Sequence, residues 1–376
     1  MHNEQLIQLI RNEITNAQGY ISFRRFMELA LYAPQLGYYS GGAHKLGRGG
    51  DFVTAPEISP LFASCIAKQC QQILTTLTHG NIIELGAGSG IFAKDLLSEL
   101  EKLNCLPAHY YILEISADLR ERQQQLLREH CPQFFSRIVW LDRLPEKPMN
   151  GIIIANEVMD AMPVNSFYIA NDGIKERCVT WQNNQFSWSL TTPTMLELTI
   201  AVEKIQQECH LDVGYISEIN LLLAAWIKSI ANLIDSGVIL LLDYGYGRRE
   251  YYHPDRNHGT LMCYYQQQRH TDPFKNIGLQ DMTAHIDFTT VIEAAVASDF
   301  MLAGYTTQAA FLLSCGLMEI AASDHASLMD QYQQSQHIKL LTLPSQMGEL
   351  IKVMALSKNY DEPLLGFSLY DRRRDL

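Results

Sequence analysis

The spacing of apolar residues along the chain changes near residue 80. Before this point apolar positions recur every three or four residues, which is the spacing of helices that bury one face. Ser22 and the pair Ser59-Pro60 stand where two of these helices would begin, and glycines concentrate between residues 41 and 50. We therefore predict a helical region at residues 1–77, interrupted by a glycine-rich flap.

Beyond residue 80 short apolar segments alternate with helical patterns. Four of these segments are predicted to be strands, at residues 82–85, 110–113, 137–141 and 152–155. A long helix is expected at 217–235, closed by Gly237, and a fifth strand at 238–242. Strands that are apolar along most of their length and alternate with helices predict a parallel sheet covered on both faces. The expected class is therefore α/β with a doubly wound sheet.

The segment 164–216 breaks this alternation. Asn171-Asp172-Gly173 and Asn183-Asn184 are typical turn sequences between runs of alternating polarity. We expect an insertion with β-hairpins here, so that the core consists of residues 78–163 and 217–376. Residues 246–288 are rich in Tyr, His and Gln, and we expect them to form a loop on the substrate side.

The overall charge argues against a nucleic-acid substrate. Among 376 residues, 41 are acidic and 29 are basic, and the formal net charge of −12 repels phosphate backbones. The eight cysteines are scattered and form no Cys-x-x-Cys pair, as is typical of a reducing compartment. The N-terminus lacks an uninterrupted apolar core, and Lys228 and Asp235 interrupt the most apolar stretch. These features predict a cytoplasmic protein with no membrane span.

Candidate cofactor chemistry lies at the end of the first predicted strand. Glu84 is followed by Gly86, Gly88 and Gly90, at the point where a strand gives way to a helix. Glycines there let the backbone approach a nucleotide closely and leave the N–H groups of the helix free. The motif lacks the Lys-Ser/Thr ending of a phosphate-binding loop. Glu84 would suit a ligand with an ammonium group, and Glu114, at the end of the second strand, is placed to bind both ribose hydroxyls.

This combination resembles the class I S-adenosylmethionine-dependent methyltransferases, which have a Rossmann-like doubly wound sheet. The resemblance implies S-adenosyl-L-methionine as the cofactor. In addition to Glu84 and Glu114, the candidate cofactor-binding residues at the strand ends are Gly86, Ala87, Gly88, Gly90, Asp142 and Asn156. Asp142 follows the third strand, where its side chain or the adjacent backbone would contact the adenine.

The fourth strand delivers a second set of polar residues to the same edge. Asn156, Glu157 and Asp160 follow this strand, and in an open α/β sheet the ligand lies across the carboxyl ends of the strands. In one interpretation Glu157 and Asp160, three residues apart on one helical face, hold the nucleophile beside the methyl group. In the other, Asn156 is only a helix cap and the two acids only match the helix dipole. Asp243, at the end of the fifth strand, belongs to the same edge or caps a loop.

Several sequence blocks, in order along nearly the whole chain, resemble the MidA family of methyltransferases. They include Tyr32-Ala-Pro34, residues 50–59, Asn156-Glu157 with Asp160-Ala-Met-Pro-Val164, Leu242-Asp-Tyr-Gly245 and residues 281–289. Residues 249–257 have no matching pattern. The family includes the mitochondrial methyltransferase needed for the assembly of respiratory complex I. The resemblance therefore implies methylation of an arginine in a partner protein, such as a complex I subunit, and favours Thr54 and Glu57 near the methionine part of the cofactor.

Arginine methylation would place defined demands on the candidate catalytic residues Glu157, Asp160, His285 and Asp287. A guanidinium has a pKa far above 7 and is a poor nucleophile, so carboxylates must orient it. Glu157 and Asp160 would clamp it, and His285 or Asp287 would take its proton, with Phe288 packed on its plane. The alternative for His285 is an ordinary hydrogen-bonded loop histidine. His285-x-Asp287 offers too few ligands for a metal, so we expect none.

Two other functions stay open from the sequence. A non-catalytic assembly factor would keep the cofactor fold as a scaffold, although it need not retain the glycines, Glu114 and Glu157. The second alternative is a methyltransferase that acts on a small molecule or a nucleic acid. Amino-methylating DNA enzymes carry an Asn-Pro-Pro-Tyr type of motif, which is replaced here by Asn156-Glu157-Val158-Met159. The sequence predicts no particular oligomeric state.

Overall fold

The computed structural model describes residues 2–41, 53–78, 80–322 and 327–376, and its centre is one large mixed sheet. The strands run in the order β15-β16-β10-β5-β2-β3-β4, with β14 paired to β10. Their bounds are β2 (Asn81–Leu85), β3 (Tyr110–Leu113), β4 (Ile138–Leu141), β5 (Met149–Asn156), β10 (Ile234–Tyr246), β14 (Ile286–Asp287), β15 (Met301–Thr307) and β16 (Ile351–Lys358). Strands β2, β3, β4, β5 and β10 pair in parallel, whereas β16 runs antiparallel to β10 and β15. The predicted doubly wound α/β fold is confirmed.

Helices cover both faces of this sheet. One face packs against α4 (Pro60–Leu77), α5 (Ile91–Lys102), α6 (Ala117–His130), α11 (Gln308–Ser314) and α12 (Leu317–Ala322). The other packs against α8 (Leu223–Ala231) and α10 (Phe288–Val296). In β10, Val238 and Leu240 face the first set, and Ile239 and Leu241 face the second. Burial on both faces explains why residues 238–242 of this strand are an unbroken apolar run.

Serine side chains begin two helices at the predicted positions. The Oγ of Ser22 accepts the N–H of Arg25 at the start of α2 (Phe23–Tyr32). The Oγ of Ser59 accepts the N–H of Leu61 at the start of α4, whose first residue is Pro60. Each contact satisfies a backbone donor that the helix itself leaves unpaired.

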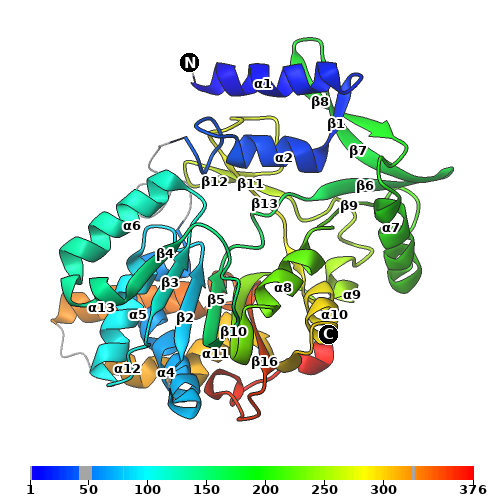
Figure 1. The fold of residues 1–376 in the computed structure, drawn as a ribbon. Helices are drawn as coiled ribbons and strands as arrows, with labels where there is room; N and C mark the ends of the chain where they lie inside the picture. Colours follow the sequence, from blue (N-terminus) through cyan, green and yellow to red (C-terminus); the bar gives the residue numbers. More distant parts are fainter. Residues whose placement is uncertain (1, 42–52, 79, 323–326) are drawn as a thin grey trace.

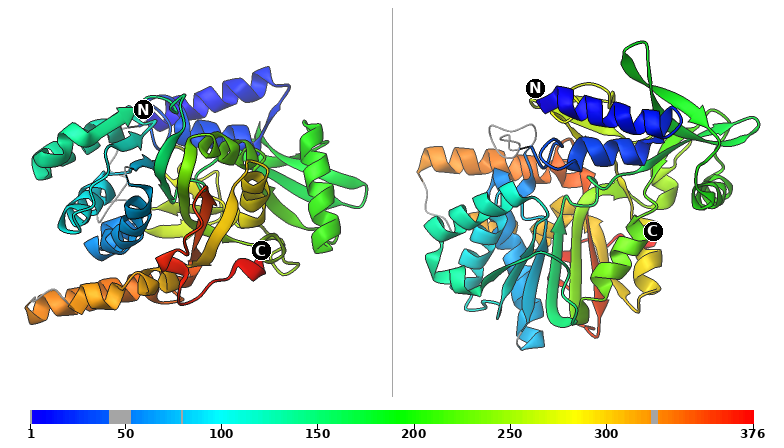
Figure 2. Two further views of the ribbon diagram at one scale, coloured as in Figure 1. Left: turned by 60° about the horizontal axis from the view of Figure 1, so that its bottom comes forward. Right: turned by 45° about the horizontal axis from the view of Figure 1, so that its top comes forward.

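A second layer, which we call the cap, lies over the carboxyl ends of the parallel strands (Figure 1). Its larger sheet contains β1 (Tyr20–Ser22), β6 (Asn165–Ala170), β7 (Gly173–Gln182), β8 (Gln185–Thr191) and β9 (Ile216–Ile219). Its smaller sheet contains β11 (Met262–Tyr265), β12 (Gln268–His270) and β13 (Asp281–Thr283). The helices of the cap are α1 (His2–Asn16), α2 and α7 (Leu196–Cys209). Figure 2 shows the cap and the main sheet from two further sides.

The N-terminal segment and the predicted hairpin insertion form one unit in the cap. β1 pairs antiparallel with β7, and α1 and α2 share an apolar cluster with both cap sheets. Within that cluster Phe26 contacts the rings of Phe186 and Phe274, at centroid distances of 5.7 and 5.4 Å. Residues far apart in the sequence therefore hold the cap together, and they position the end of α2 over the main sheet.

The remaining elements are short, apart from α13. They are α3 (Ala55–Ile58), α9 (Arg248–Tyr251), α13 (Leu328–Thr342), α14 (Met347–Leu350) and the 3-10 helices Pro132–Arg137, Leu365–Phe367 and Arg373–Asp375. Within the described ranges, every helix is too short or too polar to cross a membrane. Most of the predicted glycine-rich flap, residues 42–52, lies outside the described residues.

The prediction of a long helix at 217–235 is wrong. Residues 216–219 form β9 instead, because Glu218 is buried beneath Thr260, whose N–H it accepts at 2.8 Å. The helix α8 is confined to Leu223–Ala231. Gly237 does not close a helix but lies within β10 at a φ of 147°, where a Cβ would come within 1.9 Å of the carbonyl oxygen of Gly151.

Three other segments also differ from expectation. Residues 246–288 contain α9 and four short strands rather than one loop, since β11 pairs with β12 and β13 in the cap and β14 pairs with β10. Residues 157–160 are an irregular turn, so Asn156 caps no helix and Glu157 and Asp160 share no helical face. The insertion carries the additional helix α7, whose Leu198, Val202 and Ile205 are buried.

Candidate active site

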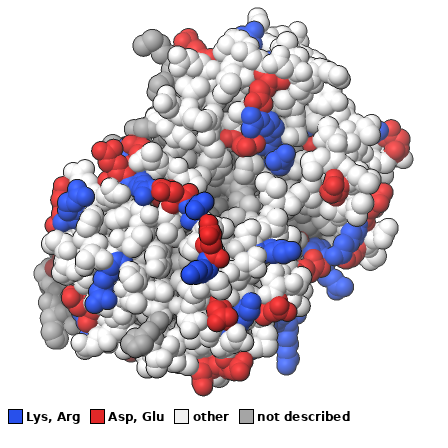
Figure 3. All heavy atoms as spheres, in the orientation of Figure 1, with Lys and Arg blue, Asp and Glu red and all other residues white. Residues whose placement is uncertain are grey.

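A cavity of about 410 Å³ lies at the carboxyl ends of β2, β3 and β5, beneath the cap. The surface is hollowed between the cap and the main sheet, near the centre of Figure 3. The predicted residues that line the cavity are Thr54, Glu57, Glu84, Gly86, Ala87, Gly88, Glu114, Asn156 and Glu157. Tyr32 and Tyr39 of the cap complete the lining on the opposite side.

The glycine loop forms one wall with its backbone. Gly86 and Gly88 adopt left-handed conformations, with φ of 68° and 53°, which L residues with side chains rarely adopt. A Cβ on Gly86 would lie 3.1 Å from Cγ2 of Val158, another residue that lines the cavity. Gly90 is the N-cap of α5 and lies outside the lining. Main-chain atoms rather than side chains therefore face this part of the cavity.

Glu84 places an acid at the base of the same wall. Its side chain is buried, and its Oε2 accepts a hydrogen bond of 2.7 Å from the hydroxyl of Tyr110. Burial raises the pKa of Glu84 to about 8, although the bond from Tyr110 acts in the opposite direction. A cationic ligand group would favour the charged form and relieve the cost of its burial.

Glu114 is fixed at the end of β3 by two hydrogen bonds. One oxygen accepts the N–H of Ser116 at 2.8 Å, and the other accepts Nε2 of Gln123 at 3.1 Å. Gln123 also donates to the carbonyl of Gly88 at 2.9 Å, and so ties the glycine loop to this acid. Burial raises the pKa of Glu114, and these bonds oppose that shift. A carboxylate with free lone pairs and a fixed orientation suits a pair of neighbouring hydroxyls.

Apolar side chains make the next part of the cavity. Ile115, Leu144, Val158, Trp226 and Ile230 line it beside Glu114. Ile115 is 80% exposed, which is unusual for a large apolar residue next to a buried acid. This part suits a flat, apolar ring that lies against Ile115 and leaves the adjacent carboxylate to hydroxyl groups.

Glu157 projects into the cavity from a strained turn after β5. Its φ is 50°, a conformation uncommon for a residue with a side chain and often found at functional sites. Its N–H donates to the carbonyl of Leu242 at 2.8 Å, and its Oε1 accepts Nδ2 of Asn156 at 3.3 Å. Burial, and then the neighbouring Asp160, raise the pKa of Glu157 to about 8.

Asp243 holds this turn from β10. Its Oδ2 accepts the N–H groups of Met159 and Asp160 at 2.9 and 3.2 Å, and its Oδ1 accepts the N–H of Tyr244 at 2.8 Å. Asp243 therefore acts as a cap for the turn, as one of the two sequence-based interpretations had it. Burial, and then Glu157, raise its pKa to about 8.

Asp160 lies behind Glu157 rather than beside it in the cavity. It is buried, it does not line the cavity, and burial together with Asp243 and Asp281 raises its pKa well above the ordinary value. Within the described part of the chain, Glu157, Asp160 and Asp243 form no ion pair with a basic side chain. The turn is therefore a buried cluster of acids that has no basic partner among the described residues and whose raised pKa values favour the neutral forms.

The short helix α3 joins the glycine loop to this turn. Glu57 accepts a hydrogen bond from the hydroxyl of Ser89, and the N–H of Ala55 lies 3.5 Å from Oε1 of Glu157. Thr54 is the N-cap of α3 by its backbone, without a side-chain cap bond. Thr54, Pro56 and Glu57 therefore line one end of the cavity, and the predicted closing of the flap stays a prediction.

Three of the predicted site residues lie elsewhere. Asp142 has a side chain that is 83% exposed and pairs with Arg120. His285 packs between the rings of Tyr244 and Tyr246, and burial followed by Arg256 and Lys352 lowers its pKa to about 4. Asp287 is the N-cap of α10 and faces away from the cavity lining.

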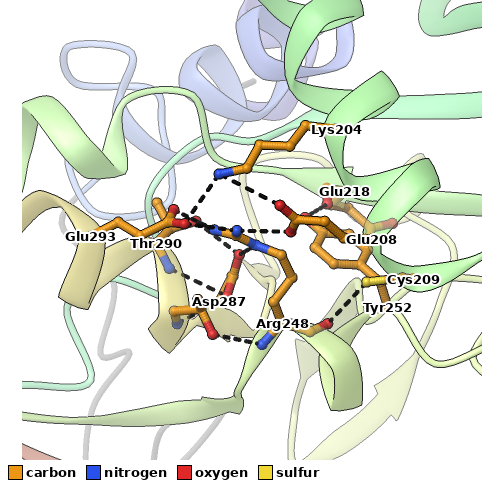
Figure 4. Close-up of polar contacts among 10 residues, drawn as sticks. Lys204, Glu208, Cys209, Glu218, Arg248, Tyr252, Asp287, Thr290 and Glu293 are labelled. Atoms are coloured by element: carbon orange, nitrogen blue, oxygen red, sulfur yellow. Dashed lines mark hydrogen bonds and ion pairs between the residues drawn. The ribbon is translucent and has the colours of Figure 1, made fainter.

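Arg248 accounts for the position of Asp287 (Figure 4). Its Nε donates to Oδ2 of Asp287 at 3.0 Å, and its two terminal nitrogens donate to Glu208 and Glu293 at 3.1 and 2.6 Å. Asp287 thus serves a network that joins α7, α9 and α10, which gives it a structural role. Phe288 is buried against Tyr305 in the core and offers no face to a substrate.

The residues at the cavity fit S-adenosyl-L-methionine. Glu84 and Glu114 would offer carboxylates to the amino group and the ribose, and Ile115 with its apolar neighbours would contact the adenine. Asn156 lines the cavity, and its Oδ1 is a buried acceptor without a hydrogen-bond partner among the described residues. A ligand with donor groups would satisfy this acceptor.

Several residues of the cavity were not predicted from the sequence. Ser89, Ile115 and Val158 directly adjoin predicted residues, so their strand-end position was an available signal. Trp226 was assigned to a long helix with no indication that the helix faces the site. Tyr39 approaches from the N-terminal region, and only its place in the fold brings it here.

Comparisons with known proteins agree with this cofactor. Residues 65–306 match a family model described as "Putative S-adenosyl-L-methionine-dependent methyltransferase". The chain is 26% identical over 380 residues to protein arginine methyltransferase NDUFAF7, mitochondrial, of Danio rerio, over 92% of this chain and 85% of that protein. It is 27% identical over 400 residues to the Drosophila melanogaster homologue, over 93% of this chain and 86% of that one.

A solved structure resembles the whole chain. It is a Burkholderia thailandensis protein described as a "likely methyl transferase" and bound to S-adenosyl-homocysteine. The TM-score is 0.95 and the identity 38%, over 100% of this chain and 97% of the other. A native structure from the same organism gives a TM-score of 0.92 at 37% identity, over 100% and 97% of the two chains.

The fold and the site together define a class I methyltransferase that uses S-adenosyl-L-methionine. The match over residues 65–306 and the similarity to solved and curated relatives are then specific enough to give the family. The chain belongs to the MidA family of S-adenosylmethionine-dependent methyltransferases.

Proposed function

We propose that this methyltransferase modifies an arginine guanidinium of a partner protein. The observation that carries the proposal is the buried acid cluster of Glu157, Asp160 and Asp243, which has no basic partner within the described chain and has Glu157 at the cavity surface. A permanent cation beside Glu157 would stabilise the charged carboxylates, and a guanidinium is permanently charged near neutral pH.

The chemistry needs only a small set of groups from the chain. S-adenosyl-L-methionine, when bound, supplies a methyl group on a positively charged sulfur. Glu157 accepts hydrogen bonds from the guanidinium and directs one nitrogen toward that methyl group. As the nitrogen–carbon bond forms and the sulfur–carbon bond breaks, the acceptor must lose one proton. The carboxylate of Glu157 is the acid–base group that faces the acceptor, and its raised pKa suits it to receive that proton.

The names of the relatives support the nature of the acceptor. The proteins of Danio rerio and Drosophila melanogaster are both named as arginine methyltransferases of the mitochondrion. The proposed substrate is therefore a protein. Within that class, the family resemblance implies a subunit of respiratory complex I. The cytoplasmic location expected from the sequence stays a prediction.

The test uses the purified chain and S-adenosylmethionine with a heavy methyl group. It is incubated with a library of peptides that carry one central arginine, with a matched lysine library, and with an extract of cells that lack the protein. Mass spectrometry should find the heavy methyl group on arginine nitrogen. Cofactor binding without any labelled product would favour an assembly factor, and label confined to the small-molecule fraction would favour a different methyltransferase; either result would overturn the proposal.

A further inference from the structure

Among the described residues, Tyr32 and Tyr39, which we call the tyrosine pair, are the aromatic side chains that the cap contributes to the cavity. Tyr32 is the last residue of α2, and Tyr39 lies in the loop that follows. Their rings are stacked at a centroid distance of 5.4 Å, with an angle of 19° between their planes. Two nearly parallel, stacked aromatic rings therefore stand together in the cavity lining.

The hydroxyls of the pair are fixed on the acid side of the cavity. Tyr32 donates to the carbonyl of Ala161 at 2.9 Å, and Tyr39 donates to Oδ1 of Asp281 at 3.0 Å. Ala161 follows Asp160 directly in the turn that carries Glu157. Burial, and then Asp281, raise the pKa values of both phenols, so both donate protons near neutral pH.

Other contacts prevent the pair from moving out of the cavity. The fully buried ring of Tyr38 packs edge-on against Tyr39 at 5.1 Å. The carbonyl of Tyr39 accepts the hydroxyl of Ser116 at 2.9 Å, which ties the loop to the end of β3. Contacts with the end of β3 and with the turn at residues 157–161, which we call the acid turn, thus hold the two rings in place. A ligand would meet rings that are already positioned.

We infer that the tyrosine pair is the surface on which the acceptor's planar cation lies, and that it selects a guanidinium over an ammonium group. This inference rests on the proposed function and adds the selectivity of the same site. A guanidinium can give its N–H edge to Glu157 and its flat face to an aromatic ring at the same time. A tetrahedral ammonium group has no flat face and directs its donors in three directions, so it gains less from this arrangement.

The test compares Tyr39→Leu and Tyr39→Phe with the wild-type chain. Each protein is assayed for KM and kcat with the arginine peptide that the wild type methylates best, and for the Kd of S-adenosyl-homocysteine by calorimetry. Tyr39→Leu should raise KM about tenfold with a smaller change in kcat, the range given by loss of one cation–aromatic contact. Tyr39→Phe keeps the ring and loses the bond to Asp281, so its KM should lie between those of the wild type and Tyr39→Leu. The Kd should be unchanged in both, which also shows that the variants fold.

Tyr32→Leu provides a second variant with the same expected effect, and Tyr370→Leu, at a tyrosine that is 56% exposed, is the matched control. The ratio of kcat/KM for the arginine peptide to kcat/KM for its lysine counterpart should decrease in Tyr39→Leu and Tyr32→Leu. It should not decrease in Tyr370→Leu. An unchanged KM, or an equal loss of affinity for S-adenosyl-homocysteine, would overturn the inference; the second result would show that the pair covers the cofactor. A wild-type chain that methylates no arginine would instead refute the proposed function, and the inference with it.

Discussion

The phenol of Tyr110 donates a hydrogen bond of 2.7 Å to Glu84, and both side chains are buried in the main sheet below the cofactor cavity. The bond favours the charged carboxylate, yet burial is the larger effect and the pKa of Glu84 is raised to about 8. Near neutral pH the acid is therefore largely protonated until a cation binds next to it. We therefore expect binding of the cofactor's ammonium group beside Glu84 to be linked to the loss of a proton from the protein.

Affinity for S-adenosyl-homocysteine should accordingly rise as the pH is raised from 6 to 8. Below its pKa Glu84 must first lose a proton, which weakens binding by up to about tenfold for each pH unit. Calorimetry at three pH values should show that the affinity of the wild type rises with pH. The affinity of Glu84→Gln should not depend on pH in this range. Tyr110→Phe removes a bond that favours the charged form and should shift the rise to higher pH.

Glu146→Gln is the control for these measurements, because the side chain of Glu146 is 80% exposed. It should retain both the affinity and the slope of the wild type. A slope that survives in Glu84→Gln would show that another group binds the ammonium.

Glu157→Gln should separate cofactor binding from methyl transfer. The amide keeps the size of the side chain but cannot balance a guanidinium or receive its proton, so kcat should fall by about 100-fold or more. The Kd for S-adenosyl-homocysteine should change by less than about threefold, since Glu84 and Glu114 are intact. Single-turnover kinetics with the arginine peptide measures the chemical step directly. An unchanged rate would reduce Glu157 to a structural part of the turn.

The ends of the parallel strands were predictable because each strand is a short apolar run with buried faces. Glu84, Glu114 and the glycines follow from those ends, and the structure places them all near one cavity. The acid turn was not predictable in detail. Its shape depends on Asp243, which binds the N–H groups of Met159 and Asp160 across a large separation in sequence.

The sequence-based hypothesis also placed Asp287 and Phe288 in the site, whereas the structure places both outside the cavity lining. Both belong to a block that resembles the family, but Arg248 binds Asp287 and the core buries Phe288. The tyrosine pair shows the opposite case. Tyr39 reaches the cavity only because β1 joins the cap sheet and α2 packs on it, and no local pattern indicates such a contact.

The free protein should become less stable as the pH rises from 7 to 8.5. The pKa values of Glu84, Glu157 and Asp243 are each raised to about 8, so in this range the folded chain binds more protons than the unfolded chain does. Stability then decreases with increasing pH. His285, whose pKa is lowered, contributes the opposite slope only below about pH 6.5 and does not disturb this range.

Melting temperatures measured across this pH range check the prediction. Glu157→Gln removes one of the three buried acids, so its melting temperature should fall less steeply than that of the wild type. Glu146→Gln should follow the wild type closely. A melting temperature that rises between pH 7 and 8.5 would contradict the claim that these buried acids lack a basic partner. The main argument for a cationic acceptor would then fail as well.

Asp287→Asn should weaken the fold without weakening the chemistry. Arg248 is 8% exposed and would then face a neutral amide while retaining Glu293 and Glu208, so stability should fall by about 1.5 kcal/mol, the low end for a hydrogen bond to a charged group. Denaturant unfolding gives this change, and kcat at 20 °C should stay within about threefold of the wild type because Asp287 lies outside the cavity lining. Asp255→Asn, at an aspartate with a side chain 94% exposed, is the control. A kcat reduced about 100-fold at unchanged stability would restore Asp287 as the proton acceptor of the sequence-based hypothesis.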